Sequence, residues 1–139
     1  MNDKFRITSE VIRVRSHFLV KLQDWHWAIA KHAIAAGEAE DNQTISMHLK
    51  AAQVDLSNIS ESGGLLGFPN LAAQADQVSH LIGLFLERCL EQPNCHKLLT
   101  DVIMEINNFV GTSKKLTDQP TVLQVIDLPF LTSEPSEVN

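Results

Sequence analysis

The sequence predicts an all-α protein, an antiparallel up-down four-helix bundle. In four segments, apolar residues recur at steps of three, four or seven, which places them on one face of a helix. No segment before residue 120 alternates with the period of two that is typical of a strand. The connections between the four segments are only a few residues long, so consecutive helices are expected to be antiparallel neighbours.

The first predicted helix has its apolar face between Val11 and Ala36, and the second has its apolar face between Ile45 and Leu66. Gly37 is expected to end the first helix, Asp41 to cap the second, and Gly67 to end it. The inward residues of the first helix are Val11, Phe18, Leu22, Trp25, Ile29, Ala33 and Ala36. Those of the second are Ile45, Leu49, Ala52, Leu56, Ile59, Gly63 and Leu66.

The third helix is predicted to begin at Pro69, and the fourth to follow Pro93-Asn94. Pro69 suits the first turn of a helix because its missing N–H would have no partner there, and the pair Pro93-Asn94 breaks the chain and caps the last helix. The inward residues of the third helix are Leu71, Ala75, Val78, Ile82, Phe85 and Cys89. Those of the fourth are Leu98, Val102, Ile106 and Phe109.

The length of 139 residues suits one domain with one core. We expect residues 1–116 to form the bundle and residues 117–139 to form an irregular tail, because the helical period stops there and proline recurs at three places. Within this tail, Val122 to Leu131 are mostly apolar and are expected to dock in part on the bundle.

Composition excludes several classes of function. A formal charge of −6, with only 11 scattered Lys and Arg residues, argues against nucleic acid as a partner. No run approaches the roughly 18 apolar residues of a membrane span, and the first residues lack the apolar core of a secretory signal. We therefore expect a cytoplasmic protein that does not bind membranes. The two cysteines, Cys89 and Cys95, are expected to be free thiols.

The stretch SESGGLLGFPNL, from Ser60 to Leu71, follows a long amphipathic segment. It resembles the junction between the second and third helices of histidine phosphotransfer (HPt) domains, where the pattern is His-x-Leu-x-Gly-Ser-x-Gly-x-x-Gly-Phe-Pro-x-Leu. The resemblance extends over residues 10–112, and it implies a helix face that glycines keep low so that a receiver domain can approach. The matching residues are Ser62, Gly64, Gly67, Phe68, Pro69 and Leu71, with Ile59 in place of the leucine.

The chain departs from this pattern at the positions that carry the chemistry. The phosphorylated histidine lies ten residues before the glycine that aligns with Gly67, and here that position is Ser57. The positions of the usual lysine and glycine are Ser60 and Glu61. A serine phosphate is far more stable than a phosphohistidine, the serine hydroxyl needs a base to react, and Glu61 would repel an aspartyl phosphate. We therefore expect no phosphotransfer and no enzymatic activity.

The expected function is a pseudo-HPt adaptor that binds a receiver domain or a histidine kinase without accepting phosphate. Its docking strip is predicted on one outward side of the second helix, although a solvated surface would show the same composition. Two alternatives remain open, namely phosphotransfer through a non-standard histidine, His48, and a purely structural bundle. The members of the strip are Lys50, Gln53, Ser57, Ser60, Glu61 and Gly64.

No cofactor or metal is expected. His17, His26 and His32 are spaced nine and six residues apart, whereas two imidazoles lie side by side on one helix at a spacing of three or four. His80 is predicted on the side of the third helix opposite its apolar face, where it would be solvated.

Val20, Trp27 and Ile34 form a second apolar stripe on the first helix, because residues seven apart lie on one side. The stripe is predicted about 180° from the inward face, and a bundle helix needs only one apolar face. Isolated surface residues, the tail folding back, or a second copy of the chain would each account for it, and the sequence favours slightly a homodimer with Trp27 near its twofold axis.

Overall fold

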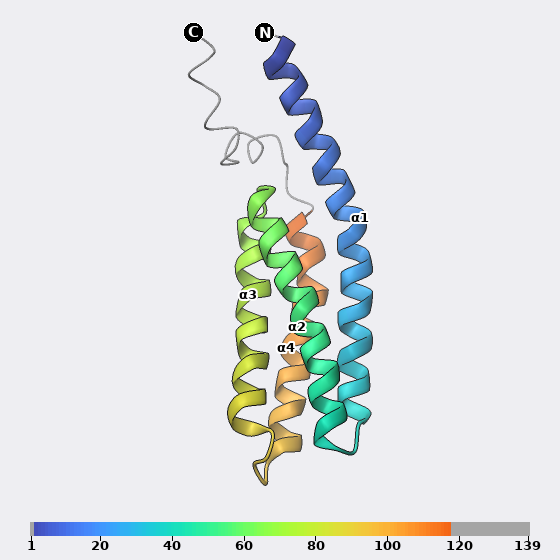
Figure 1. The fold of residues 1–139 in the computed structure, drawn as a ribbon, viewed down its shortest axis with the longest axis vertical. Helices are drawn as coiled ribbons and strands as arrows, with labels where there is room; N and C mark the ends of the chain where they lie inside the picture. Colours follow the sequence, from blue (N-terminus) through green and yellow to red (C-terminus); the bar gives the residue numbers. More distant parts are fainter. Residues whose placement is uncertain (1, 118–139) are drawn as a thin grey trace.

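A computed structural model describes residues 2–117, which form four α-helices and one π-helical turn. No strand occurs in this part of the chain, so the predicted all-α class is confirmed. Figure 1 shows the helices side by side, with the chain descending along α1 and α3 and ascending along α2 and α4. The elements are α1 (Asn2–Glu38), α2 (Asn42–Leu65), α3 (Pro69–Leu84), the π-helix η1 (Phe85–Cys89) and α4 (Cys95–Thr117).

The helix boundaries follow local chemistry. Asp41 caps α2, where its carboxylate accepts a hydrogen bond of 2.6 Å from the backbone N–H of Thr44. This hydrogen bond holds the pKa of the Asp41 carboxyl below its usual value, since it stabilises the charged form. Pro69 occupies the first turn of α3, where its missing N–H has no cost.

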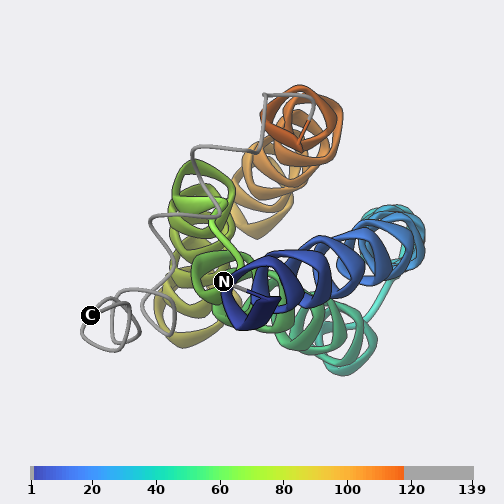
Figure 2. The same cartoon turned by 90° about the horizontal axis from the view of Figure 1, so that it is seen from above.

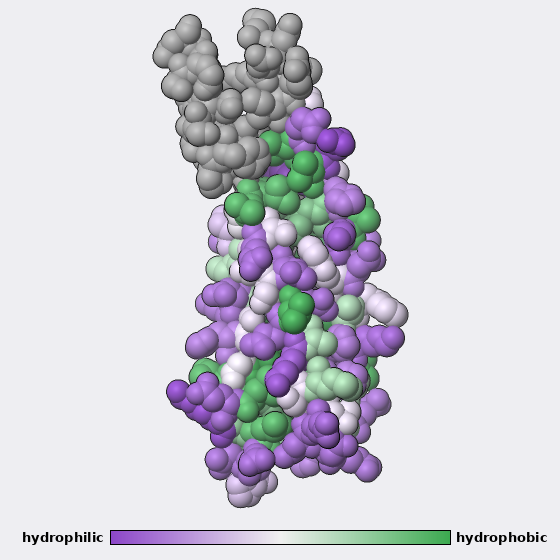
Figure 3. Space-filling view, viewed as in Figure 1, coloured by the Kyte–Doolittle hydropathy of each residue, from purple (hydrophilic) through white to green (hydrophobic). Residues whose placement is uncertain are grey.

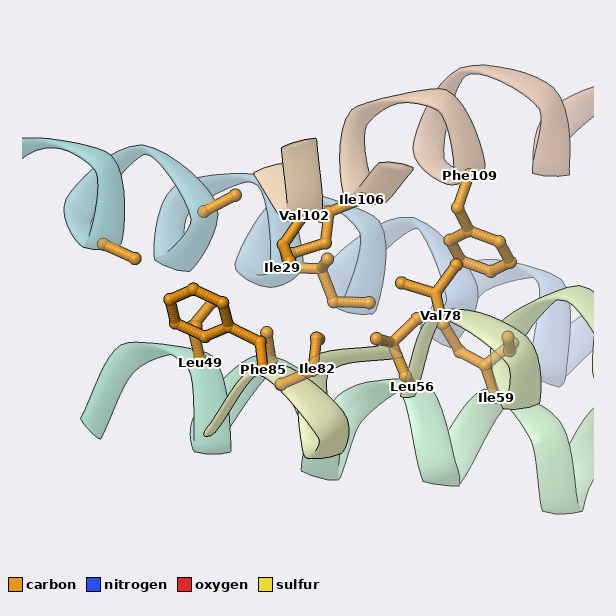
Figure 4. Packing of buried hydrophobic residues seen from close by; sticks show 14 of the residues in the cluster. Ile29, Leu49, Leu56, Ile59, Val78, Ile82, Phe85, Val102, Ile106 and Phe109 are labelled. Carbon is orange, nitrogen blue, oxygen red and sulfur yellow. The ribbon is translucent and has the colours of Figure 1, made fainter. Parts of the chain in front are cut away.

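All four helices contribute apolar side chains to one interior, which Figure 4 shows from close by. Figure 2 shows the arrangement of the helices from above. Every predicted inward residue of α1, α2 and α3 is buried except Trp25, Leu66 and Cys89, which are half-buried and pack against the core. The helical period therefore predicted the core faces of these three helices.

The fourth helix is rotated slightly from the predicted orientation. Leu99 is buried, with 2% of its surface exposed, whereas Leu98 is half-buried against the core. Both residues have a helical spacing to Val102, so the periodicity alone does not choose between them. The helix also includes Thr117, which the end of the helical period assigns to the tail; the rest of the predicted tail lies outside the described residues.

The described residues also bear on two predictions from composition. Both Cys89 and Cys95 are free thiols, and burial raises the pKa of Cys95. None of the helices within residues 2–117 combines the length and the apolar character that crossing a bilayer requires.

Candidate functional site

The junction between α2 and α3 depends on Gly67. Its φ is 91°, a left-handed conformation that glycine adopts readily and other residues do not. This conformation reverses the chain so that the backbone N–H of Phe68 donates a hydrogen bond of 2.8 Å to the carbonyl of Gly63. The chain then enters α3 directly at Pro69. The matched residues of the junction therefore have a local structural role.

Phe68 anchors the junction in the core. Only 2% of its surface is exposed, and its ring stacks on Phe18 of α1 with centroids 5.7 Å apart. The guanidinium of buried Arg15 lies 4.5 Å from the centroid of the same ring, within the range of a cation–π interaction. Burial lowers the pKa of Arg15, because desolvation disfavours its charged form.

The last turns of α2 contain two glycines, Gly63 and Gly64, at positions where a larger side chain would also fit. A Cβ at Gly63 would meet Phe18 at 3.6 Å and Leu71 at 3.7 Å, which are ordinary van der Waals distances. A Cβ at Gly64 would meet Ala72 at 3.7 Å. Because glycine costs about 1 kcal/mol relative to alanine inside a helix, internal packing does not account for either residue.

The predicted docking strip lies along the side of α2 that borders α3. Gln53 donates a hydrogen bond of 3.0 Å from Nε2 to the carbonyl of Ser79, and Gly83 leaves the space for that side chain, since a Cβ there would lie 3.2 Å from it. The face over α2 is largely hydrophilic, with separate apolar residues (Figure 3). Lys50, Glu61 and Gly64 are exposed, whereas Gln53, Ser57 and Ser60 are half-buried.

The structure adds α3 residues to this surface that the sequence analysis missed. A shallow pocket of about 320 Å³ lies beside the strip, and Gln53 is one of its walls. His80 also lines it and is exposed, as the sequence predicted, but its proximity to the strip comes from the packing of α3 on α2. The other lining residues are Asp76, Ser79, Gly83, Leu84 and Glu87.

His48, the alternative phosphoacceptor, faces α1 instead of the strip. Its Nδ1 atom lies 3.0 Å from Nδ1 of His32, and both rings are half-buried. Such a contact is a hydrogen bond when one ring carries a proton on Nδ1 and the other does not. Burial raises the pKa of nearby Asp55, and the charge of His32 opposes this increase. No spacing along a single helix predicts this pair, because His32 is in α1 and His48 is in α2.

His26 is paired as well, through α4. Its Nε2 atom is hydrogen-bonded to the hydroxyl of Ser113, which is fully buried. The imidazole also packs edge-on against Phe109, with ring centroids 6.1 Å apart. Burial lowers the pKa of His26, since desolvation disfavours the imidazolium. Ser113 has no exposed surface, so a ligand cannot reach its hydroxyl. The hydrogen bond between His26 and Ser113 therefore serves to join α1 to α4.

Residues 2–117 hold no group of three or more His, Cys, Asp or Glu side chains that could bind a metal ion.

The apolar stripe of α1 faces solvent, with 63% of Val20, 69% of Trp27 and 60% of Ile34 exposed. Lys31 lies against the stripe, its Nζ 5.0 Å from the ring centroid of Trp27.

Comparison of the chain with protein-family models, with curated proteins and with solved structures finds no match. The assignment of a function therefore depends on the geometry of the α2–α3 surface.

Proposed function

We propose that this chain is an HPt-like signalling protein that binds a receiver domain or a histidine kinase and does not accept phosphate. The docking surface is the α2 strip from Lys50 to Gly64 together with the neighbouring residues of α3. In this proposal the four helices form the antiparallel up-down bundle of an HPt domain.

One observation carries the proposal, namely the combination of an HPt-like junction with a changed acceptor position. Gly67 has the positive φ that the glycine at the end of such a helix requires, and Ser57 lies ten residues before it on the side of α2 that borders α3. This is the position where the resemblance places the phosphorylated histidine. A serine there presents a poor nucleophile to a partner that can still dock.

Gly64 and Glu61 support binding without transfer. Gly64 is exposed, and an alanine Cβ would fit there, so internal packing does not require a glycine. The close approach of a partner to this side of α2 explains the missing side chain better. Glu61 is exposed one turn after Ser57, where its carboxylate would repel the phosphate of an approaching phosphoaspartate. Gly64 therefore favours docking, and Glu61 disfavours the transfer of a phosphoryl group.

Binding to purified receiver domains and histidine kinases from the same cell tests the proposal. Gly64→Gln adds a long polar side chain to the strip, and Asn58→Gln adds one methylene to an exposed residue of the same helix outside it. We expect Gly64→Gln to weaken binding about tenfold or more, which corresponds to about 1.4 kcal/mol, and Asn58→Gln to leave it unchanged. Equal effects of the two variants would contradict the assignment of the strip.

The same mixtures, prepared with radiolabelled phosphoreceiver, test the two alternatives. Acid-labile label on the chain that His48→Gln removes would establish phosphotransfer through His48. Label that His80→Gln removes would assign it to the histidine beside the strip. If no receiver domain or kinase binds at all, the chain is a structural bundle and the proposal is wrong.

A further inference from the structure

We propose that the groove between α3 and α4 binds a small organic cation with an apolar body, such as an alkylammonium compound. The groove has a volume of about 610 Å³, which lies within the range of roughly 300–1,000 Å³ that is usual for small-molecule sites. Such sites commonly form between the helices of a bundle. This inference is independent of the function proposed above.

Both walls of the groove are apolar. Leu81, Leu84 and Phe85 form the wall on the side of α3, and Leu98 and Val102 belong to the wall on α4. Phe85 and Val102 are buried members of the core, whereas the three leucines are half-buried. The floor of the groove is therefore continuous with the core, and the hydrophobic effect favours the burial of an apolar body against it.

The π-helix η1 forms one end of the α3 wall. Its first and last residues, Phe85 and Cys89, both line the groove. Single π-helical turns are rare and occur frequently at functional sites. On the opposite wall, Met104 is 56% exposed, and its flexible thioether can adapt to ligands of different shapes. Both features are typical of a binding surface.

Two carboxylates on the rim determine the charge of the ligand. Asp101 and Glu105 line the groove, are exposed, and lie four residues apart on one side of α4, where like charges repel. Within residues 2–117 neither carboxylate makes a hydrogen bond or an ion pair. The basic residues Arg88 and Lys97 are close in sequence but do not line the groove. A cation at the rim would relieve the repulsion, and an anion would increase it.

The size of the groove favours a small molecule over a protein partner. Leu81 and Cys89 are eight residues apart, which is about 12 Å along a helix axis. A stable protein interface uses roughly 20–30 residues on each side, far more than the groove offers. A ligand with a body about 12 Å long and one cationic group would occupy the apolar walls and the acidic rim together.

Two amphiphiles with the same alkyl chain and opposite charges test the proposal. Isothermal titration calorimetry measures the binding of decyltrimethylammonium and of decyl sulfate to the full-length protein, each below its critical micelle concentration. Asp101→Asn combined with Glu105→Gln removes the charges of the rim. As a matched control, Asp24→Asn combined with Glu38→Gln removes the same charge from exposed positions on α1. Far-UV circular dichroism checks that every protein remains folded with each probe.

The alkylation of Cys89 locates the bound probe. Cys89 is half-buried and lines the groove, whereas Cys95 is buried. The rate at which iodoacetamide modifies each thiol is measured by mass spectrometry of the digested protein. We expect a saturating concentration of decyltrimethylammonium to slow the modification of Cys89 several-fold. Cys95 is the internal control, because its modification should remain slow while the bundle is folded.

We expect decyltrimethylammonium to bind at least tenfold more tightly than decyl sulfate, a difference of about 1.4 kcal/mol. The rim variant should bind the cation at least tenfold more weakly than the unmodified chain, and the α1 variant should bind it equally well. Equal losses in the two variants would show attraction to the net charge alone and overturn the proposal. Equal affinities for the two probes, no binding of the cation, or binding that leaves the modification rate of Cys89 unchanged would also overturn it.

Discussion

Replacing the glycines at the end of α2 one at a time separates two different roles. Gly67 has a φ of 91°, where an L side chain is strained by about 1–2 kcal/mol, so Gly67→Ala should lower the free energy of unfolding by that amount. At Gly63 and Gly64 the nearest atoms to a Cβ are 3.6 and 3.7 Å away, so a methyl group fits. Gly63→Ala and Gly64→Ala should therefore raise the free energy of unfolding by up to about 1 kcal/mol.

Urea denaturation followed by far-UV circular dichroism measures all three variants. Gly111 supplies the control, because nothing in the described bundle lies within 4 Å of a Cβ at this position in α4. The increase in the free energy of unfolding caused by Gly111→Ala reports helix propensity alone. The increases caused by Gly63→Ala and Gly64→Ala should be of similar size. A Gly67→Ala variant as stable as the unmodified protein would refute the role of the positive φ. A loss at Gly63 or Gly64, with a gain at Gly111, would show that the junction does not tolerate a methyl group.

Three further predictions concern stability. Ser57→His combined with Glu61→Gly should cost less than about 2 kcal/mol in the free energy of unfolding, since both positions are outside the core; a greater loss in urea denaturation would undo the alignment with HPt domains. Asp41→Ala should lower the free energy of unfolding at neutral pH through loss of the N-cap hydrogen bond to Thr44, as measured by urea denaturation. Because the pKa of Asp41 is lowered in the folded state, this cost should disappear as the pH falls through that pKa, and a cost that persists in acid would contradict the capping role. The pKa of His26 is lowered by burial, so the unfolded chain takes up this proton first as the pH falls below about 6.5, and thermal stability should decrease there. His26→Gln should make the melting temperature less dependent on pH, whereas His80→Gln, at an exposed position, should leave this pH dependence unchanged. If the melting temperature changes with pH equally in the two variants, His26 is not the source of the pH dependence.

Most of the fold follows from short-range features of the sequence. The steps of three and four from Ile45 to Gly63 identify the buried side of α2, and Pro69 marks the start of α3. The π-helix from Phe85 to Cys89 had no such signal, since its residues keep a helical pattern. The same limit applies to Leu98 and Leu99, whose spacings to Val102 are both helical.

Only part of the candidate site could be predicted from the sequence. Residues of one helix, such as Ser57 and Glu61, are placed on the same side by the helix geometry alone. The contribution of His80 to the pocket beside Gln53 depends on how α3 packs on α2, and no spacing in the sequence encodes it.

The sequence by itself determined the helix boundaries at Asp41, Gly67 and Pro69 and the buried sides of α1, α2 and α3, because capping, proline geometry and the 3.6-residue period act over a few neighbouring residues. Only the tertiary structure decided which side chains from different helices meet. His32 contacts His48, His26 contacts Ser113, and Gln53 reaches the carbonyl of Ser79. Each of these pairs depends on the rotation and the axial shift of one helix against another. Both quantities are set by the packing of the whole core at once, since its side chains must fill a common interior without voids.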